Sequence, residues 1–182
     1  LTEDEVLLTL EKLGLEGRHF DHLELHSAIQ EYMDLEIRLE IIRDDRCALV
    51  GRALRRSGIQ AALVYVEEAD YLTMQIPATA HAAEWKDIFY HELSHLLGHH
   101  PLPHIEKGQK SGEVSFWHPP QSLCRRRPPL NLEACRSDPG LRRGLIRWCE
   151  MEADSWTEHL RSISAYGRRI YLREEFILGD QK

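Results

Sequence analysis

The sequence predicts a single α+β domain, residues 1–182, in which a small and mostly antiparallel sheet packs against helices. Three apolar runs in the first half, 37–41, 59–66 and 71–76, have the alternation or the β-branched and aromatic composition of strands. Stretches with apolar residues three and four positions apart precede and follow these runs, which is typical of amphipathic helices. A chain of 182 residues is long enough to bury one core of this kind.

Two helices are expected before the first strand. Residues 2–13 form a short acidic helix, with Thr2 as its N-cap and Gly14 as its stop, within an N-terminal helical arm that covers 1–20. A second helical stretch covers residues 22–33.

The predicted strands occupy the middle of the first half. Residues 37–41 alternate apolar and charged side chains, as a half-buried strand does, and 46–56 form a further helix. The runs 59–66 and 71–76 are joined by a short acidic segment and predict a hairpin, which Pro77 ends because proline cannot donate to a ladder.

The clearest helix covers residues 81–99, where large apolar side chains recur at helical spacing. A later helix begins at Asp138-Pro139, a cap followed by a favourable first-turn residue, and ends near Leu160. Residues 163–177 form a separate closing helix.

The segment 101–139 holds seven of the eight prolines and little periodicity, so it is predicted to be a long irregular insertion. Its basic run, Arg125 to Arg127, is interpreted as a solvated loop.

Composition narrows the class of protein. A formal charge of −7 argues against direct nucleic-acid binding through a generally basic surface. No apolar run approaches the roughly 20 residues of a membrane span, and no signal pattern opens the chain. The cysteines form no C-x-x-C pair, which favours reduced thiols and a cytoplasmic location. They are Cys47, Cys124, Cys135 and Cys149.

The motif His91-Glu92-Leu93-Ser94-His95 lies on the clearest predicted helix. Histidines four residues apart project from nearly the same side of a helix, where two imidazoles can take two corners of a zinc tetrahedron. Glu92 is placed beside such a metal and could take a proton from a metal-activated water. The motif therefore predicts Zn²⁺ bound by His91 and His95, with Glu92 as the catalytic residue.

A catalytic zinc site of this type needs a third ligand. The position six residues after His95 is Pro101, which excludes the histidine of the metzincin pattern. Glu150 and Asp154 share one face of the later helix, so Glu150 could bind the metal while Asp154 hydrogen-bonds a ligand histidine from the second shell. Glu152 stands within the apolar stripe of the same helix and is the alternative ligand.

These two motifs resemble the metallopeptidase domain of the ImmA/IrrE family. The resemblance covers roughly residues 59–160 and is carried by the segment 85–99, with His-Glu-Leu-Ser-His-Leu-Leu-Gly-His, and by the later Glu-x-Glu-Ala-Asp. It implies a zincin-like, gluzincin-like fold, in which the small sheet packs on the HExxH helix and on the glutamate-bearing helix. It also implies zinc ligands at His91, His95 and Glu150, with Glu92 as general base.

Members of this family cleave or regulate helix-turn-helix repressors in the bacterial cytosol. The resemblance therefore implies a zinc-dependent endopeptidase in which metal-activated water hydrolyses a peptide bond of a cytosolic protein partner, such as a bacterial or phage repressor. The alternative is a non-proteolytic zinc-binding regulatory module that binds a transcription factor or an antitoxin-like partner. The general base Glu92 favours the enzyme, because a purely structural zinc site does not need one.

Two further expectations concern the substrate. Residues 71–76 should form a strand whose free edge beside the zinc helix pairs with an extended peptide, while 101–139 provides specificity. The donor that stabilises an oxyanion could be His118, His159 or Tyr166.

Overall fold

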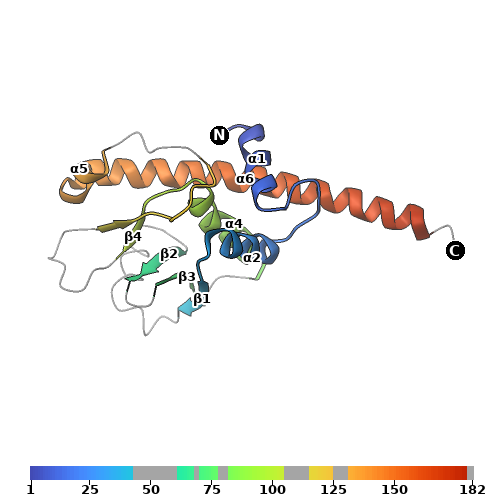
Figure 1. Ribbon diagram of the computed structural model, residues 1–182, viewed down its shortest axis with the longest axis horizontal. Helices are drawn as coiled ribbons and strands as arrows, with labels where there is room; N and C mark the ends of the chain where they lie inside the picture. The colour runs from blue at the N-terminus through green and yellow to red at the C-terminus, as the bar shows by residue number, and fades with distance from the viewer. Residues whose placement is uncertain (43–60, 68–69, 78–81, 105–114, 125–130, 180–182) are drawn as a thin grey trace.

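A computed structural model describes residues 1–42, 61–67, 70–77, 82–104, 115–124 and 131–179, and these ranges form an α+β structure (Figure 1). The predicted helix 46–56 and the basic run at 125–127 lie outside the described residues. In chain order the elements are α1 (Glu3–Lys12), α2 (His22–Met33), β1 (Ile37–Ile42), β2 (Ala62–Val66), β3 (Tyr71–Pro77), α4 (Ala82–Leu97), β4 (Leu102–His104), β5 (Ser115–Trp117), α5 (Leu132–Ser137) and α6 (Pro139–Gly179).

The first two helices begin at reciprocal caps. The Thr2 side chain accepts a hydrogen bond from the backbone of Glu5, whose carboxylate accepts one from the Thr2 backbone. Asp21 and Glu24 form the same capping box at α2. Each box satisfies backbone donors that a helix start leaves unpaired, so local sequence is sufficient to fix both starts. The predicted cap at Thr2 and the stop at Gly14, which has a φ of 66°, are confirmed.

The sheet has five strands in the order β1-β3-β2-β4-β5. The predicted hairpin is confirmed, because β2 and β3 are antiparallel with Leu63 opposite Met74. The expectation of a mostly antiparallel sheet is wrong, since β1 runs parallel to β3 and β2 runs parallel to β4. Parallel pairing is set by the path of the connecting chain, which strand composition does not reveal.

Strand β3 lies between β1 and β2, which contradicts the expected free edge at residues 71–76. It pairs with β1 from Leu72 to Pro77 and with β2 from Tyr71 to Gln75. Thr73 and Gln75 donate side-chain hydrogen bonds to Glu40 of β1, so these polar residues also have partners across the sheet. An extended peptide therefore cannot add to β3.

The segment 101–139 is less irregular than predicted. It contributes β4, β5 and α5, and Tyr65 of β2 stacks on Trp117 of β5 with ring centroids 4.6 Å apart. Both strands have only three residues, and β4 contains Pro103, so neither has a strand-like pattern of its own. Their pairing with the sheet creates these strands.

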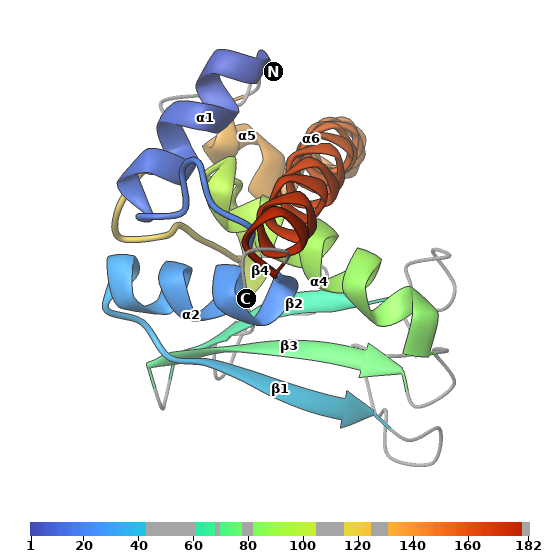
Figure 2. The same cartoon turned by 90° about the vertical axis from the view of Figure 1, so that its right-hand side faces the viewer.

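The helices cover one side of the sheet in two layers. Figure 2 shows α2 and α4 directly against the strands, with α6 on the far side of α4. The core lies between these layers and includes fully buried Leu72 of β3, Leu93 of α4 and Trp156 of α6. Helix α4 is thus held between the sheet and α6, and its polar residues can meet those of α6.

Helix α6 is one continuous helix of 41 residues, whereas two helices were predicted. Its start is as expected, because Asp138 accepts hydrogen bonds from the backbones of Gly140 and Leu141. The predicted break near Leu160 contains no proline, and the hydrogen-bonded backbone continues through it. The helix extends beyond the sheet toward the C-terminus (Figure 1). None of the described helices combines the length and apolarity that crossing a bilayer requires.

A buried hydrogen-bond chain ties α4 and α6 to the loop before α2. The Tyr90 hydroxyl of α4 donates to Ser164 Oγ of α6 at 3.2 Å, and Ser164 donates to the Phe20 carbonyl at 2.9 Å. All three residues are buried, so the chain replaces hydrogen bonds that water would otherwise provide.

We expect Tyr90→Phe to lower the free energy of unfolding by about 1 kcal/mol, because one buried hydrogen bond is lost while the ring remains. Urea denaturation of the metal-free protein measures this change. Tyr32→Phe is the matched control, because Tyr32 is only partly buried and packs at the margin of the core. Equal effects of the two substitutions would contradict a specific contribution from the Tyr90 hydroxyl.

Candidate metal centre

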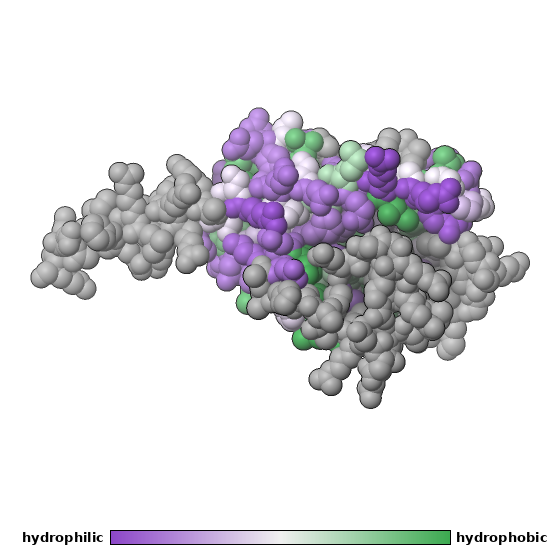
Figure 3. Space-filling view, turned by 180° about the vertical axis from the view of Figure 1, so that it is seen from behind, coloured by the Kyte–Doolittle hydropathy of each residue, from purple (hydrophilic) through white to green (hydrophobic). Residues whose placement is uncertain are grey.

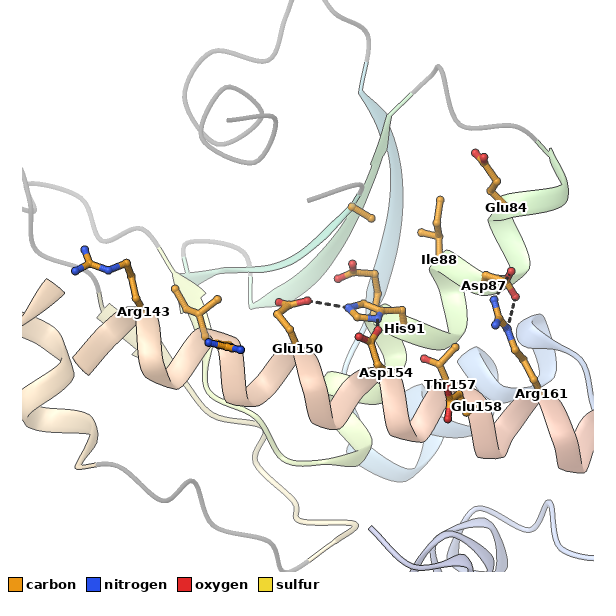
Figure 4. Close-up of a pocket in the computed structure, with 14 residues that line it drawn as sticks. Glu84, Asp87, Ile88, His91, Arg143, Glu150, Asp154, Thr157, Glu158 and Arg161 are labelled. Atoms are coloured by element: carbon orange, nitrogen blue, oxygen red, sulfur yellow. Dashed lines mark hydrogen bonds and ion pairs between the residues drawn. The ribbon is translucent and has the colours of Figure 1, made fainter. Parts of the chain in front are cut away.

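Three potential metal ligands meet where α4 faces α6. His91 and His95 lie one turn apart on α4, with ring centroids 5.2 Å apart. Glu150 of α6 lies near both rings, with Oε2 3.0 Å from His91 Nε2 and Oε1 3.8 Å from His95 Nε2. Figure 4 shows the contact between His91 and Glu150. All three ligand atoms lie within 4.8 Å of one another, and this group could hold a metal ion.

The spacing fits the ligand set of zinc. With bonds of about 2.0–2.1 Å, two ligands of a tetrahedral ion are separated by roughly 3.3–3.4 Å. The distance from His91 Nε2 to Glu150 Oε2 is 3.0 Å and that from His95 Nε2 to Glu150 Oε1 is 3.8 Å, so one carboxylate oxygen lies somewhat closer and the other somewhat farther than that separation. Two nitrogens and one carboxylate leave a fourth corner open, as catalytic zinc sites do.

Asp154 lies against the ring of the first histidine. Its Oδ1 is 3.1 Å from His91 Nδ1, on the opposite side of the ring from the nitrogen that faces Glu150. Ionised carboxylates only accept, so in the metal-free protein Asp154 favours a proton on Nδ1 of His91 and Glu150 favours one on Nε2. A bound metal would displace the proton on Nε2, while Asp154 would keep the one on Nδ1. Asp154 therefore lies within reach of His91, the kind of contact predicted for it with a ligand histidine.

Glu92 lies beside the three ligands in a dry environment. Glu92 is 5% exposed and accepts a hydrogen bond from the Leu63 backbone of β2. It also lines a pocket between α4 and α6, together with His91 and Glu150. Burial raises the pKa of Glu92 to about 7, while the neighbouring His91 opposes the shift. A carboxyl with that pKa can exchange a proton near neutral pH, as a general base or acid must.

The two histidines have different electrostatic surroundings. Burial lowers the pKa of His95 well below its ordinary value, and the nearby His100 and His91 lower it further. Burial also acts to lower the pKa of His91, but the hydrogen bond that its ring donates to Glu150 and the surrounding carboxylates outweigh burial and raise the pKa. His95 is thus held neutral, the form in which an imidazole binds a metal.

A pocket of about 870 Å³ between α4 and α6 is lined by His91, Glu92, Glu150 and Asp154, whereas the buried His95 is not among its lining residues. Figure 4 shows Arg143 at one end of it, Glu150 and His91 in the middle, and Glu84 beyond the ion pair of Asp87 with Arg161 at the other end. The described surface at the level of α6 is mainly hydrophilic, with small separate apolar areas (Figure 3). The pocket itself is lined mostly by charged residues, and also by Ala61, Ile88 and Ile146, so it is suited to a ligand that has both polar and apolar groups.

Other residues considered as functional lie elsewhere. Glu152 is turned away from the three ligands and its Oε2 is 3.3 Å from His100 Nε2. His118 is adjacent to His99, and His159 Nδ1 donates to the carbonyl of Ser155. Neither His118 nor His159 lines the pocket. The side chain of Tyr166 lies outside the described part of the structure. His100, which no sequence motif singles out, is fully buried against His95.

Comparisons with protein-family models, curated proteins and solved structures found no match to this chain. The resemblance to the ImmA/IrrE family therefore rests on the two short motifs, and the function must be argued from the geometry of the chain's own residues.

Burial of Glu92 gives a prediction that needs no metal. The carboxyl has an unperturbed pKa of 4.5 and a folded-state pKa of about 7, so the fold prefers its protonated form. The protonated Glu92 carboxyl therefore adds to the free energy of unfolding at low pH, and this contribution is lost as pH rises from 4.5 to 7. Glu92→Gln should thus stabilise the metal-free protein by roughly 3 kcal/mol above pH 7 and by much less near pH 4.5.

Melting temperatures of both proteins across this pH range, in the presence of a chelator, measure the difference. Glu158→Gln is the matched control, because Glu158 lines the same pocket but is exposed. A difference that does not change with pH would show that the Glu92 carboxyl is not desolvated.

Proposed function

We propose that this protein is a zinc-dependent endopeptidase with a zincin-like, gluzincin-like catalytic site. The observation that carries the proposal is the meeting of His91, His95 and Glu150 from two helices, with the buried carboxyl of Glu92 in the same pocket. A structural zinc site is closed by four protein ligands and has no need of such a carboxyl.

The proposed roles follow from position. When bound by these three residues, zinc supplies the Lewis acidity that activates water and polarises a peptide carbonyl. Glu92, whose buried carboxyl lies next to His91 and Glu150, accepts the proton of the attacking water and returns it to the leaving amine. Asp154 keeps His91 in the orientation and tautomer that a ligand requires.

The shape and lining of the site favour a protein segment as the substrate. The pocket runs along α6 and is lined by charged residues at both ends, which can bind the side chains and polar backbone of an extended peptide. From the sheet, Ala61 just before β2 lines the pocket, and β3 does not. Together with the motif resemblance, this supports a cytoplasmic protein partner such as a helix-turn-helix repressor.

We expect the purified protein to bind about one zinc per chain, because the described residues contain one group of three converging ligands. Glu150→Gln should weaken zinc binding at least about tenfold, since an amide oxygen is a poorer ligand than a carboxylate. Elemental analysis and competition with a chromophoric chelator measure both quantities. Unchanged affinity in Glu150→Gln would remove Glu150 from the ligand set, whereas Glu158→Gln should have no effect.

Glu92→Gln should retain zinc but lose peptide hydrolysis by about 100-fold or more, because the amide cannot accept the proton from water. Cleavage of candidate repressors, followed by mass spectrometry, measures turnover, and zinc content is determined on the same samples. Binding of a repressor without cleavage by the zinc-loaded wild type would favour the non-proteolytic regulatory module instead. Wild-type turnover by Glu92→Gln would contradict the general-base role.

A further inference from the structure

On the Nδ1 side of its ring, the second histidine ligand meets another imidazole, whereas His91 meets the carboxylate of Asp154. His95 Nδ1 is 3.0 Å from His100 Nδ1, and His100 Nε2 is 3.3 Å from Glu152 Oε2. His100 is 0% exposed and Glu152 is 6% exposed, so water cannot replace these partners. The three residues form a buried chain from α6 to the end of α4.

The end of α4 creates this chain. The backbone N–H of His99 bonds to the Leu96 carbonyl at 3.1 Å, and that of His100 bonds to the His95 carbonyl at 2.8 Å. These are the two hydrogen bonds of a Schellman motif, in which the residue after the left-handed position lies against a residue of the last turn. That contact is commonly apolar, but here it joins two imidazoles. His99 occupies the left-handed position with a φ of 54°.

The position of each proton follows from the partners. A carboxylate accepts only, so Glu152 favours the proton of His100 on Nε2. A neutral imidazole has one N–H, which makes His100 Nδ1 an acceptor and requires His95 Nδ1 to donate. The remaining nitrogen of His95, Nε2, then carries its lone pair toward Glu150 and the pocket.

We propose that Glu152 and His100 are positioning residues that act as a hydrogen-bond relay, fixing the ring and the tautomer of His95 so that its Nε2 is ready to bind the metal. This inference rests on the proposed metal site, but the tautomer itself is a property of the metal-free protein. The relay also accounts for a glutamate within the apolar stripe of α6, since Glu152 orients a ligand without competing for the metal.

Gly98 supports the same assignment by its size. A Cβ atom at this position would lie 2.5 Å from His100 Nε2, closer than real contacts allow. Gly98 is not among the described residues with positive φ, so its backbone does not require glycine. Glycine is required instead by the narrow space beside the His100 ring, because the ring has to approach α4 closely to reach both His95 and Glu152.

The tautomers can be measured directly by long-range ¹H–¹⁵N NMR of histidine-labelled, chelator-treated protein at neutral pH. We expect the proton of His95 on Nδ1 and that of His100 on Nε2. His100→Phe fills the space but provides no acceptor, so the Nε2-protonated tautomer of His95 should become populated and zinc affinity should fall about 10- to 100-fold. Glu152→Met should shift the tautomers in the same direction.

Two variants separate the relay from simple packing. His100→Asn can place its amide oxygen near the position of Nδ1, so it should restore the His95 tautomer and bring zinc affinity to within a few-fold of wild type. His99→Asn removes a neighbouring imidazole at a residue that tolerates left-handed backbone, and it should change neither quantity. Circular dichroism confirms that each variant is folded before it is compared.

The outcomes are distinct. A folded His100→Phe with wild-type zinc affinity and an unchanged His95 tautomer would overturn the relay, as would Nε2-protonated His95 in the wild type. If the tautomers are as expected but the wild type binds no zinc, the relay is present and the proposed metal function fails. If His100→Phe and His100→Asn lose affinity equally with no change of tautomer, His100 has only a packing role.

Discussion

The packing of α4 against α6 is the constraint on which the site depends. Leu93, Leu96 and Leu97 of α4 are fully buried, and Ala153 and Trp156 of α6 are fully buried within the same layer. Burying such side chains contributes about 1.5–3 kcal/mol each, which is enough to hold polar groups together at the margin of the contact. Because two helices fix the ligands, the distance from Glu150 to His91 is set by core packing and does not depend on a loop.

This packing makes the metal-free site costly. Glu92 and His95 are both buried, and their charged forms are disfavoured by desolvation. A divalent cation would favour the ionised form of Glu92 by supplying opposite charge, and it would be bound by His95 in the neutral form that burial already favours. Metal binding should therefore be coupled to stability.

The positions of three acidic residues on α6 show how one helix serves separate roles. Successive residues of a helix are separated by about 100°, so Glu150 and Asp154 face the same way while Glu152 faces nearly the opposite way. Glu150 reaches the two histidines, Asp154 reaches the outer side of His91, and Glu152 reaches the buried His100. A shift of one residue along the helix would exchange a ligand for a core residue.

The sequence by itself determined what depends on neighbours along the chain. Caps and periodicity predicted α1, α2, α4 and the start of α6, and alternation with a turn predicted the β2–β3 hairpin. The four-residue spacing of His91 and His95, and that of Glu150 and Asp154, likewise followed from helical geometry.

Tertiary structure decided what depends on distant segments. It placed β3 between two strands, made β4 and β5 from a proline-rich segment, and continued α6 through the predicted break. It also brought Glu150 near both histidines and turned His100 under His95, where Glu152 could meet it. Strand neighbours and side-chain contacts between helices are set by packing of the whole core, and packing energy is not a property of any short stretch of sequence.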